Sequence, residues 1–135
     1  MISEPSDRHI VKTYLEAARE ALAGGEYNLQ GGYYGTAVNR AYYAVFYSAN
    51  ALLATQGLAR GKHSGIIGAF RQFFVKPGMI EPEYSDIYGS LMDDRHASDY
   101  DMDTRIEPER AESDVQSARR FVTRIERYLR QEGWL

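Results

Sequence analysis

The chain has 135 residues, 44% of them hydrophobic and 26% charged, with a net charge of −3 and no cysteine. The missing cysteines exclude disulfides, thiolate metal sites and cysteine nucleophiles, and the acidic balance excludes a strongly basic nucleic-acid binder. No apolar run approaches the roughly 20 residues of a membrane span, and the N-terminus lacks a secretory signal, so we expect one globular cytoplasmic domain over residues 1–135, with its core at about 7–129.

Helical periodicity predicts two long helices in the first half of the chain. The first covers about residues 7–23, after which Gly24 and Gly25 supply a stop signal. The second covers about residues 33–56 and has an apolar face beside a face of small alanine and serine residues. Small residues allow neighbouring helices to approach closely, so we expect this second helix at the centre of the fold.

The second half of the chain predicts a short helix and two longer ones. A basic, glycine-containing connection at residues 60–65 leads to the short helix, which contains Phe70 and Phe74. Pro82 and Pro108 then stand where the last two helices should begin, because proline fits the first helical position. No segment alternates apolar and polar residues for long enough to form a strand. The predicted fold class is therefore all-α, an antiparallel up-and-down bundle of four long helices plus a short one.

Arg95 occupies an unusual position in the fourth predicted helix, which begins at Pro82. The apolar stripe of Tyr84, Tyr88 and Leu91 steps next onto Arg95. A guanidinium stays charged at neutral pH, so its burial requires a partner, and Asp99 lies one helical turn further on. Either the pair orients the arginine at a functional cleft, or the helix is ending and the pair is an ordinary surface ion pair.

A polar and aromatic stripe follows one line of the second predicted helix. Asn39, Tyr43, Tyr47 and Asn50 recur at helical spacing, and Arg40 lies beside them. Such groups can bind a nucleobase, hydrogen-bond to the arginine and aspartate described above, or form a self-association surface. Alternatively, the tyrosines pack in the core with their hydroxyls at its rim.

Other motifs exclude several kinds of site. His9, His63 and His96 have no partner at metal-ligand spacing, so we expect no metal ion. The glycines form neither a phosphate-binding loop nor a nucleophile elbow, and no cofactor is predicted. Thirteen of the sixteen basic residues are arginine, which suits recognition of phosphate or carboxylate groups or reflects a codon preference.

Three segments resemble the small prokaryotic HEPN-domain proteins. They read NRAYYAVFY at residues 39–47, KHSG at 62–65 and RHASDY at 95–100, and the resemblance spans roughly residues 7–129. It implies an antiparallel helical bundle that forms a homodimer and is often encoded beside a minimal nucleotidyltransferase. In many members of the family, this bundle is an RNA-cleaving toxin.

The resemblance also implies a site. In the RNase members, an Arg followed after four to six residues by a His lies in a cleft between two protomers and cleaves RNA without a metal ion. The Arg stabilises charge in the transition state while the His transfers a proton. Arg95 matches the arginine, but Tyr100 stands at the first position expected for the His, and His96 follows Arg95 directly. A tyrosine with an ordinary pKa of about 10 is a poor base at neutral pH.

The residues and the resemblance leave two main functional hypotheses. In the first, the protein is the HEPN component of a toxin–antitoxin pair and a metal-independent endoribonuclease. In the second, it binds RNA or a nucleotide without catalysis as the partner of a nucleotidyltransferase, and a third alternative is a homodimeric scaffold. The catalytic candidates are Arg95, Asp99, Tyr100 and His96, with Tyr100 also a candidate for adenylyl modification. The RNA- or nucleotide-binding candidates are Asn39, Arg40, Tyr43, Tyr47, Lys62 and His63.

Overall fold

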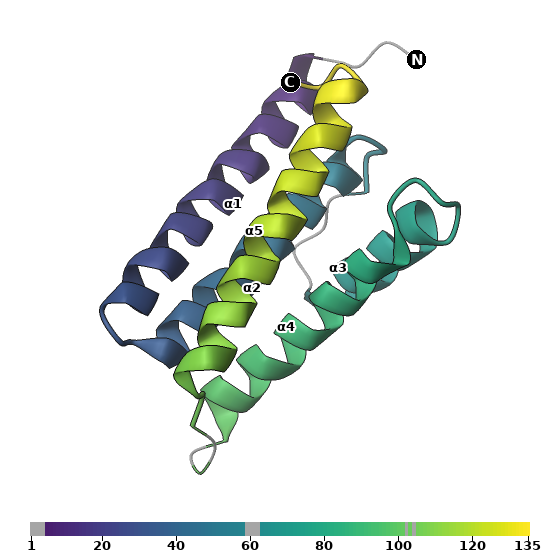
Figure 1. The fold of residues 1–135 in the computed structure, drawn as a ribbon. Coiled ribbons are helices and arrows are strands. Elements are labelled where there is room, and N and C mark those ends of the chain that lie inside the picture. Colours follow the sequence, from purple (N-terminus) through teal and green to yellow (C-terminus); the bar gives the residue numbers. More distant parts are fainter. Residues whose placement is uncertain (1–4, 59–62, 102, 104) are drawn as a thin grey trace.

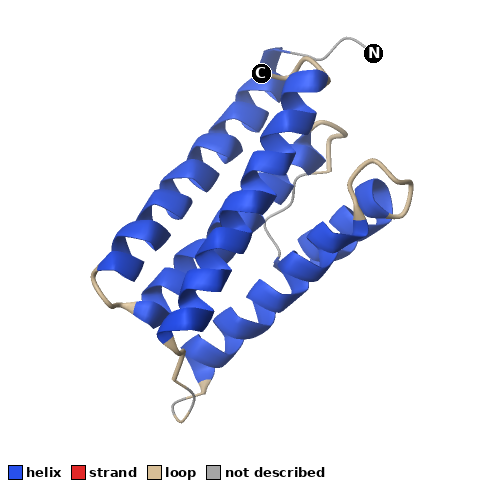
Figure 2. Cartoon of the chain, viewed as in Figure 1, coloured by secondary structure: helices blue, strands red, loops and turns tan. Residues whose placement is uncertain are grey.

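The computed structural model describes residues 5–58, 63–101, 103 and 105–135. The elements in chain order are α1 (Pro5–Gln30), α2 (Tyr34–Ala54), α3 (His63–Phe70), η1 (Arg71–Val75), α4 (Pro82–Tyr100) and α5 (Pro108–Gln131). All of them are helical, η1 being a short π-helix, and the described residues contain no strand (Figure 2). None of the described helices combines the length and the apolar character that crossing a membrane requires. The all-α fold class is confirmed.

The four long helices alternate in direction, and α2 lies at the centre of the bundle. Figure 1 shows α1 and α5 side by side, with α4 on the other side of α5. α2 packs against all three of these helices and also contacts α3. Its residues Ala37, Ala41 and Ala44 are completely buried, and their small side chains let the neighbouring helices approach closely. The predicted central position of this helix is confirmed.

The predicted end of the first helix was wrong, because Gly24 and Gly25 lie inside α1, which continues to Gln30. These glycines serve helix packing instead of termination. A Cβ at position 25 would lie 3.4 Å from the backbone oxygen of Ala37, at van der Waals contact, so the backbone of α2 approaches α1 closely here. The chain turns only after Gln30, through Gly32, whose φ of 81° lies in the region that favours glycine.

Both proline helix starts are confirmed. Pro82 and Pro108 are the first residues of α4 and α5, and each follows a glutamate in extended conformation. Proline has no backbone N–H to leave unpaired in the first turn, and its fixed φ already suits a helix. These two positions therefore define where the last two helices begin.

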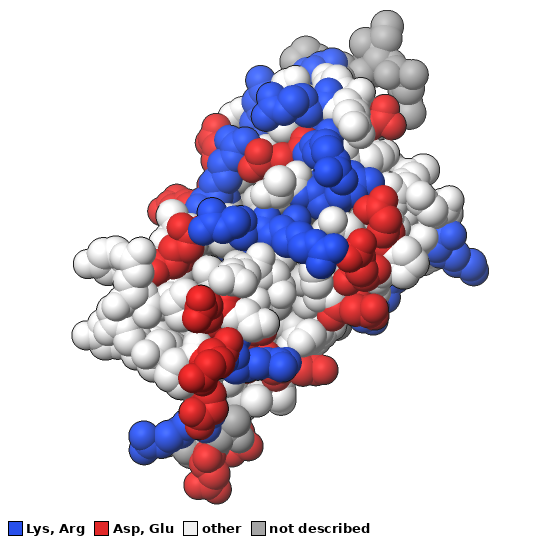
Figure 3. Space-filling view, viewed as in Figure 1, with Lys and Arg blue, Asp and Glu red and all other residues white. Residues whose placement is uncertain are grey.

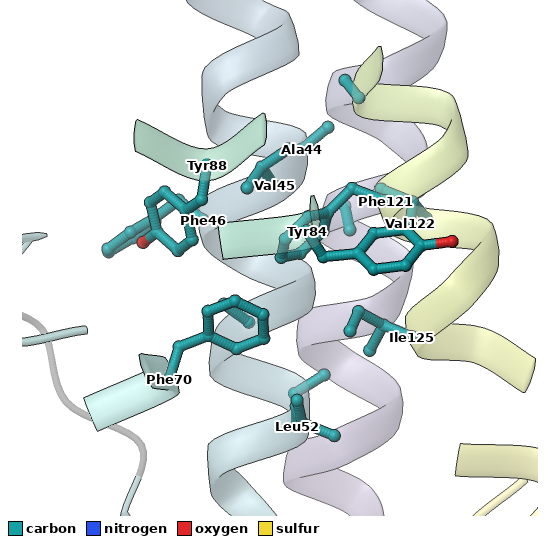
Figure 4. Packing of buried hydrophobic residues seen from close by; sticks show 14 of the residues in the cluster. Ala44, Val45, Phe46, Leu52, Phe70, Tyr84, Tyr88, Phe121, Val122 and Ile125 are labelled. Carbon is teal, nitrogen blue, oxygen red and sulfur yellow. The ribbon is translucent and has the colours of Figure 1, made fainter. Parts of the chain in front are cut away.

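An aromatic cluster fills the core between α3, α4 and α5 (Figure 4). The ring centre of Phe121 lies 5.3 Å from that of Phe70, 6.2 Å from that of Tyr84 and 5.9 Å from that of Tyr88. All four side chains are buried. Tilted and edge-to-face ring pairs stabilise a core beyond the apolar area that they bury, so this cluster holds α3 and α4 against α5.

A polar cluster joins the second half of α4 to the start of α5. Arg110 donates from Nε to Asp94 Oδ2 at 2.6 Å and from Nη2 to Ser90 Oγ at 3.1 Å, and its Nε lies 3.7 Å from Asp114 Oδ1. Asp114 is only 4% exposed, and its Oδ2 has no hydrogen-bond partner within the described part of the chain. Burial and the neighbouring Asp94 raise the pKa of Asp114 well above the ordinary carboxyl range.

Asp114→Asn should flatten the pH dependence of stability. Asp114 has a pKa of about 3.9 in the unfolded chain, but the folded protein keeps the carboxyl protonated to higher pH. As pH rises from about 4 towards the raised pKa, the unfolded state loses its proton first. The free energy of unfolding of the wild type therefore falls by up to about 1.4 kcal/mol per pH unit in this range. The amide has nearly the same shape but does not titrate, so the variant lacks this loss. The measurement is the free energy of urea unfolding between about pH 5 and pH 7.

The control is Asp93→Asn, which removes an exposed carboxylate from α4 and should leave the wild-type slope unchanged. An unchanged slope in Asp114→Asn would show that Asp114 is ionised in the folded protein.

Candidate functional site

Arg95 lies where the buried stripe of α4 meets α2. Its side chain is only 16% exposed, so it does not extend into water as an ordinary surface ion pair would. Its guanidinium carbon lies 4.6 Å from the ring centre of Tyr42 and 5.9 Å from that of Tyr43, within the range of cation–π attraction. Its Nε is buried and has no hydrogen-bond partner among the described residues. The positive charge is therefore held against aromatic faces.

Asp99 and Asn39 connect Arg95 to Arg40 across the contact between α4 and α2. Asp99 Oδ2 accepts from Arg95 Nη1 at 3.5 Å and from Asn39 Nδ2 at 3.4 Å, both long hydrogen bonds. Asn39 Oδ1 in turn accepts from Arg40 Nε at 3.1 Å and from Arg40 Nη2 at 3.0 Å. The guanidiniums of Arg95 and Arg40 are thus linked to the single carboxylate of Asp99, Arg95 directly and Arg40 through the amide of Asn39. These side chains carry two positive charges and one negative charge, and an anion could neutralise the difference. The Arg95 site, as we use the term, comprises Arg95, Asp99, Asn39, Arg40, Tyr42 and Tyr43.

Gly35 lets the start of α2 and the end of α4 come close enough to form this site. A Cβ at position 35 would lie 2.9 Å from Ser98 Oγ, a distance that real Cβ atoms essentially never show. Asn39 lies one helical turn after Gly35, and Asp99 directly follows Ser98. The missing side chain at position 35 therefore brings the amide of Asn39 within reach of the carboxylate.

Tyr42 is a site residue that the sequence analysis did not select. It is completely buried. Burial raises the pKa of Tyr42 to about 12, and the positive charge of Arg95 offsets only part of that rise. The ring is therefore an uncharged platform beneath the guanidinium at neutral pH. Arg95 itself was the available signal, because a buried arginine commonly stacks on an aromatic face.

The remaining residues of the predicted α2 stripe have two different environments. Tyr43 and Tyr47 are half-buried, with ring centres 5.8 Å apart, and the Arg40 guanidinium lies 5.0 Å from the Tyr43 ring centre. Arg40 and Tyr47 line a hollow of about 660 Å³ between α1 and α2, together with Tyr27, whereas Arg95 does not line it. Asn50 was wrongly included in the stripe. It is completely buried and donates to a backbone oxygen one turn earlier in α2.

His96 and Tyr100 form a separate pair on the exposed side of the end of α4. Their ring centres lie 4.9 Å apart, and Tyr100 is 67% exposed. No hydrogen bond between described residues joins either side chain to Arg95 or Asp99. The structure therefore brings Arg95 and Asp99 together with the α2 residues but leaves the two other catalytic candidates outside this network.

Two predicted binding residues have no described position for their side chains. Lys62 lies outside the described residues, and so does the side chain of His63. Within the part of the chain that the structure covers, no three His, Asp or Glu side chains lie close enough together to hold a metal ion.

Comparison with known proteins assigns the family. The HEPN domain matches residues 11–128. Two proteins of Methanocaldococcus jannaschii, each named "Putative toxin", are 39% identical over 124 residues (92% of both chains) and 30% identical over 115 residues (85% of this chain, 78% of the relative). A Thermotoga maritima protein named as a UPF0332 protein is 34% identical over 120 residues, 89% of this chain and 91% of its own. The chain therefore belongs to the HEPN-domain family.

Proposed function

We propose that this HEPN-domain protein is the toxin-like component of a toxin–antitoxin pair and that its Arg95 site binds RNA. The names of the two Methanocaldococcus relatives support the toxin part of the proposal. The observation that carries the RNA part is the Arg95 guanidinium, which rests on Tyr42 and makes only one long hydrogen bond among the described residues. A fixed guanidinium with unused donors is suited to bind phosphate oxygens in two-pronged geometry.

The Arg95 site suits RNA cleavage without a metal ion. In that reaction the 2′-hydroxyl attacks the adjacent phosphorus and gives its proton to a base, and the 5′-oxygen leaves after taking up a proton. Negative charge builds on the non-bridging oxygens, which Arg95 would stabilise while Asp99 keeps the guanidinium oriented. His96 would be the base, because histidine is the side chain that most often transfers protons in catalysis, whereas the raised pKa of Tyr42 keeps that hydroxyl protonated.

A second copy of the chain completes the site in this proposal. His96 makes no hydrogen bond to Arg95 within one chain, so we assign it to a phosphate bound at Arg95 of the other copy. The hollow between α1 and α2 supports self-association, because it has Tyr27, Tyr47 and Arg40 around a floor of alanine and glycine. Tyrosine and arginine are the residue types that protein interfaces favour.

A second function is favoured by the absence of a histidine at position 100 and by the exposure of Tyr100. Here the protein binds RNA or a nucleotide without cleaving it and is the partner of a minimal nucleotidyltransferase. Tyr100 would then accept an adenylyl group from a nucleoside triphosphate: its oxygen bonds to the α-phosphorus, its proton passes to solvent, and pyrophosphate leaves.

Arg95→Ala should lower the rate of RNA cleavage by about 100-fold or more, because it removes a charge that contacts the transition state. The measurement is cleavage of end-labelled RNA in the presence of EDTA, with the exposed Arg105→Ala as a control that retains activity. Equal cleavage by the wild type and Arg95→Ala would refute the ribonuclease proposal. No cleavage by either protein, with calorimetric binding lost in Arg95→Ala, would establish the non-catalytic function instead.

Asp99→Asn should separate binding from catalysis. The amide keeps the size of the side chain but removes the negative charge that competes with phosphate for Arg95, so RNA binding should be at least as tight as in the wild type. Cleavage should fall by roughly tenfold, because the guanidinium is less firmly oriented. The two quantities are KM and kcat for a short RNA. Weaker binding in Asp99→Asn would mean that Asp99 itself contacts the ligand.

Tyr47→Lys should disrupt the homodimer, since it places a charge at the hollow and opposite another copy of itself. Light scattering should show a shift from dimer to monomer, while circular dichroism should show an unchanged helix content. Tyr33→Lys is the matched control, because Tyr33 is 67% exposed and does not line the hollow. If both variants have the mass of the wild type, the hollow is not the interface.

A further inference from the structure

A second polar hollow lies on the outer face of α5, apart from the Arg95 site. It measures about 360 Å³, and Arg119, Arg120, Arg124 and Arg127 line it together with Tyr84 of α4. Figure 3 shows Lys and Arg side chains gathered over α5 on this face of the molecule. We call these five residues the α5 groove. No step of the proposed reaction uses them.

The two outermost arginines of the α5 groove are free to exchange partners. Arg119 pairs with Glu26 and Arg120 with Glu83, and both arginine side chains are 57% exposed. Exposed ion pairs of this kind contribute little to stability, so either guanidinium can turn to another anion at little cost. Arg120 also stacks on Tyr84, its guanidinium carbon 5.5 Å from the ring centre. That stacking leaves the edge of the guanidinium available for hydrogen bonds.

Arg124 is the buried and fixed positive charge of the α5 groove. It is 8% exposed, and its Nε and Nη2 donate to the two carboxylate oxygens of Glu81 at 2.7 and 3.2 Å. Its Nη1 is buried without a hydrogen-bond partner in the part of the chain that the structure describes. The hydrogen bond from Arg124 lowers the pKa of Glu81, and the positive charges of Arg124 and Arg127 also contribute to this lowering. This carboxylate therefore stays ionised and keeps Arg124 in place.

The α5 groove has more positive than negative charge. Three of its four arginines pair with Glu26, Glu83 and Glu81, and Arg127 forms no ion pair within the described part of the chain. This local surplus exists in a chain whose net charge is −3. Anions are attracted by the local arrangement of charge and not by the total, so the groove is an anion-binding surface.

The shape of the α5 groove favours a chain of anions over a single one. Its lining residues on α5 run from Gln116 to Arg127, which at 1.5 Å per residue is about 16 Å along the helix. A nucleic-acid strand has one phosphate in its backbone at every nucleotide. An acidic peptide must instead immobilise a flexible side chain for every carboxylate that binds, which costs conformational entropy. The groove therefore favours the nucleic acid.

We propose that the α5 groove binds a single strand of nucleic acid through its phosphates, as a second contact surface outside the Arg95 site. That the strand is RNA rests on the function proposed above. Along α4, Tyr84 precedes Arg95 by 11 residues, or about 16 Å along the helix axis. The groove contributes affinity without sequence selectivity, since phosphates are the same at every nucleotide.

The test is fluorescence anisotropy of a labelled single-stranded RNA of about 12 nucleotides, titrated with the full-length protein at several salt concentrations. The double variant Arg120→Gln/Arg127→Gln removes two groove charges and retains Arg124. It should weaken binding by about tenfold and reduce the slope of log K against log salt by about 1.4, or about 0.7 for each lost phosphate contact. The double variant Lys12→Gln/Arg105→Gln removes the same charge from exposed positions on other segments and should bind like the wild type.

Three outcomes would overturn the proposal. The first is equal weakening by the two double variants, which would mean that net charge alone governs binding. The second is wild-type affinity in the groove variant. The third is displacement of the RNA by polyglutamate or inorganic phosphate at equal charge concentration, which would mean that the groove takes any anion. Arg95→Ala distinguishes this proposal from the function proposed for the Arg95 site. If the groove variant loses RNA binding while Arg95→Ala binds and cleaves RNA like the wild type, the groove proposal is supported and the function proposed for the Arg95 site is refuted.

Discussion

A positive charge held away from water determines the geometry of the end of the bundle that contains the Arg95 site. α4 has no fully buried residue after Leu91, so apolar packing does not hold its last two turns. Arg95 takes over that task through the face of Tyr42, with Asp99 and Asn39 beside it. Because Tyr42 is completely buried and the Arg95 side chain is only 16% exposed, the attraction of the cation to the ring is stronger than it would be at the surface. The interactions that anchor α4 are therefore the same ones that shape the Arg95 site.

α4 is held on its other side by a second group of charges. Asp94 precedes Arg95 directly, but it faces Arg110 and Asp114 of α5, whereas Arg95 faces α2. Two adjacent residues thus bind opposite neighbours, and the end of α4 is fixed between them. One of these attachments includes a buried carboxyl, Asp114, whose pKa is raised by burial and by the neighbouring Asp94.

Arginine has two distinct physical roles in this chain. The side chain of Arg95 is mostly buried and pairs with one carboxylate, that of Asp99, so it presents one oriented guanidinium. The α5 groove instead has several guanidiniums in a row, two of them exposed and loosely paired and one, Arg124, buried and firmly paired. A single oriented charge suits a reaction centre, while a row of exchangeable charges suits a long polyanion. The net charge of −3 indicates neither role, because it sums all charges of the chain without regard to their positions.

The sequence by itself determined the helices, because apolar period and proline starts such as Pro82 are properties of neighbouring residues. It also indicated that Arg95 was anomalous, since a charge in an apolar stripe is visible without any fold. The sequence could not decide whether Gly25 ends the first helix or lets another helix pack against it, because glycine serves both purposes. Only the approach of α2 distinguishes the two. The choice of Tyr42 as the platform, and the burial of Asn50 away from the site, were likewise decided by the tertiary structure. Contacts between helices depend on how each helix is rotated and placed against its neighbours, and no local period specifies that.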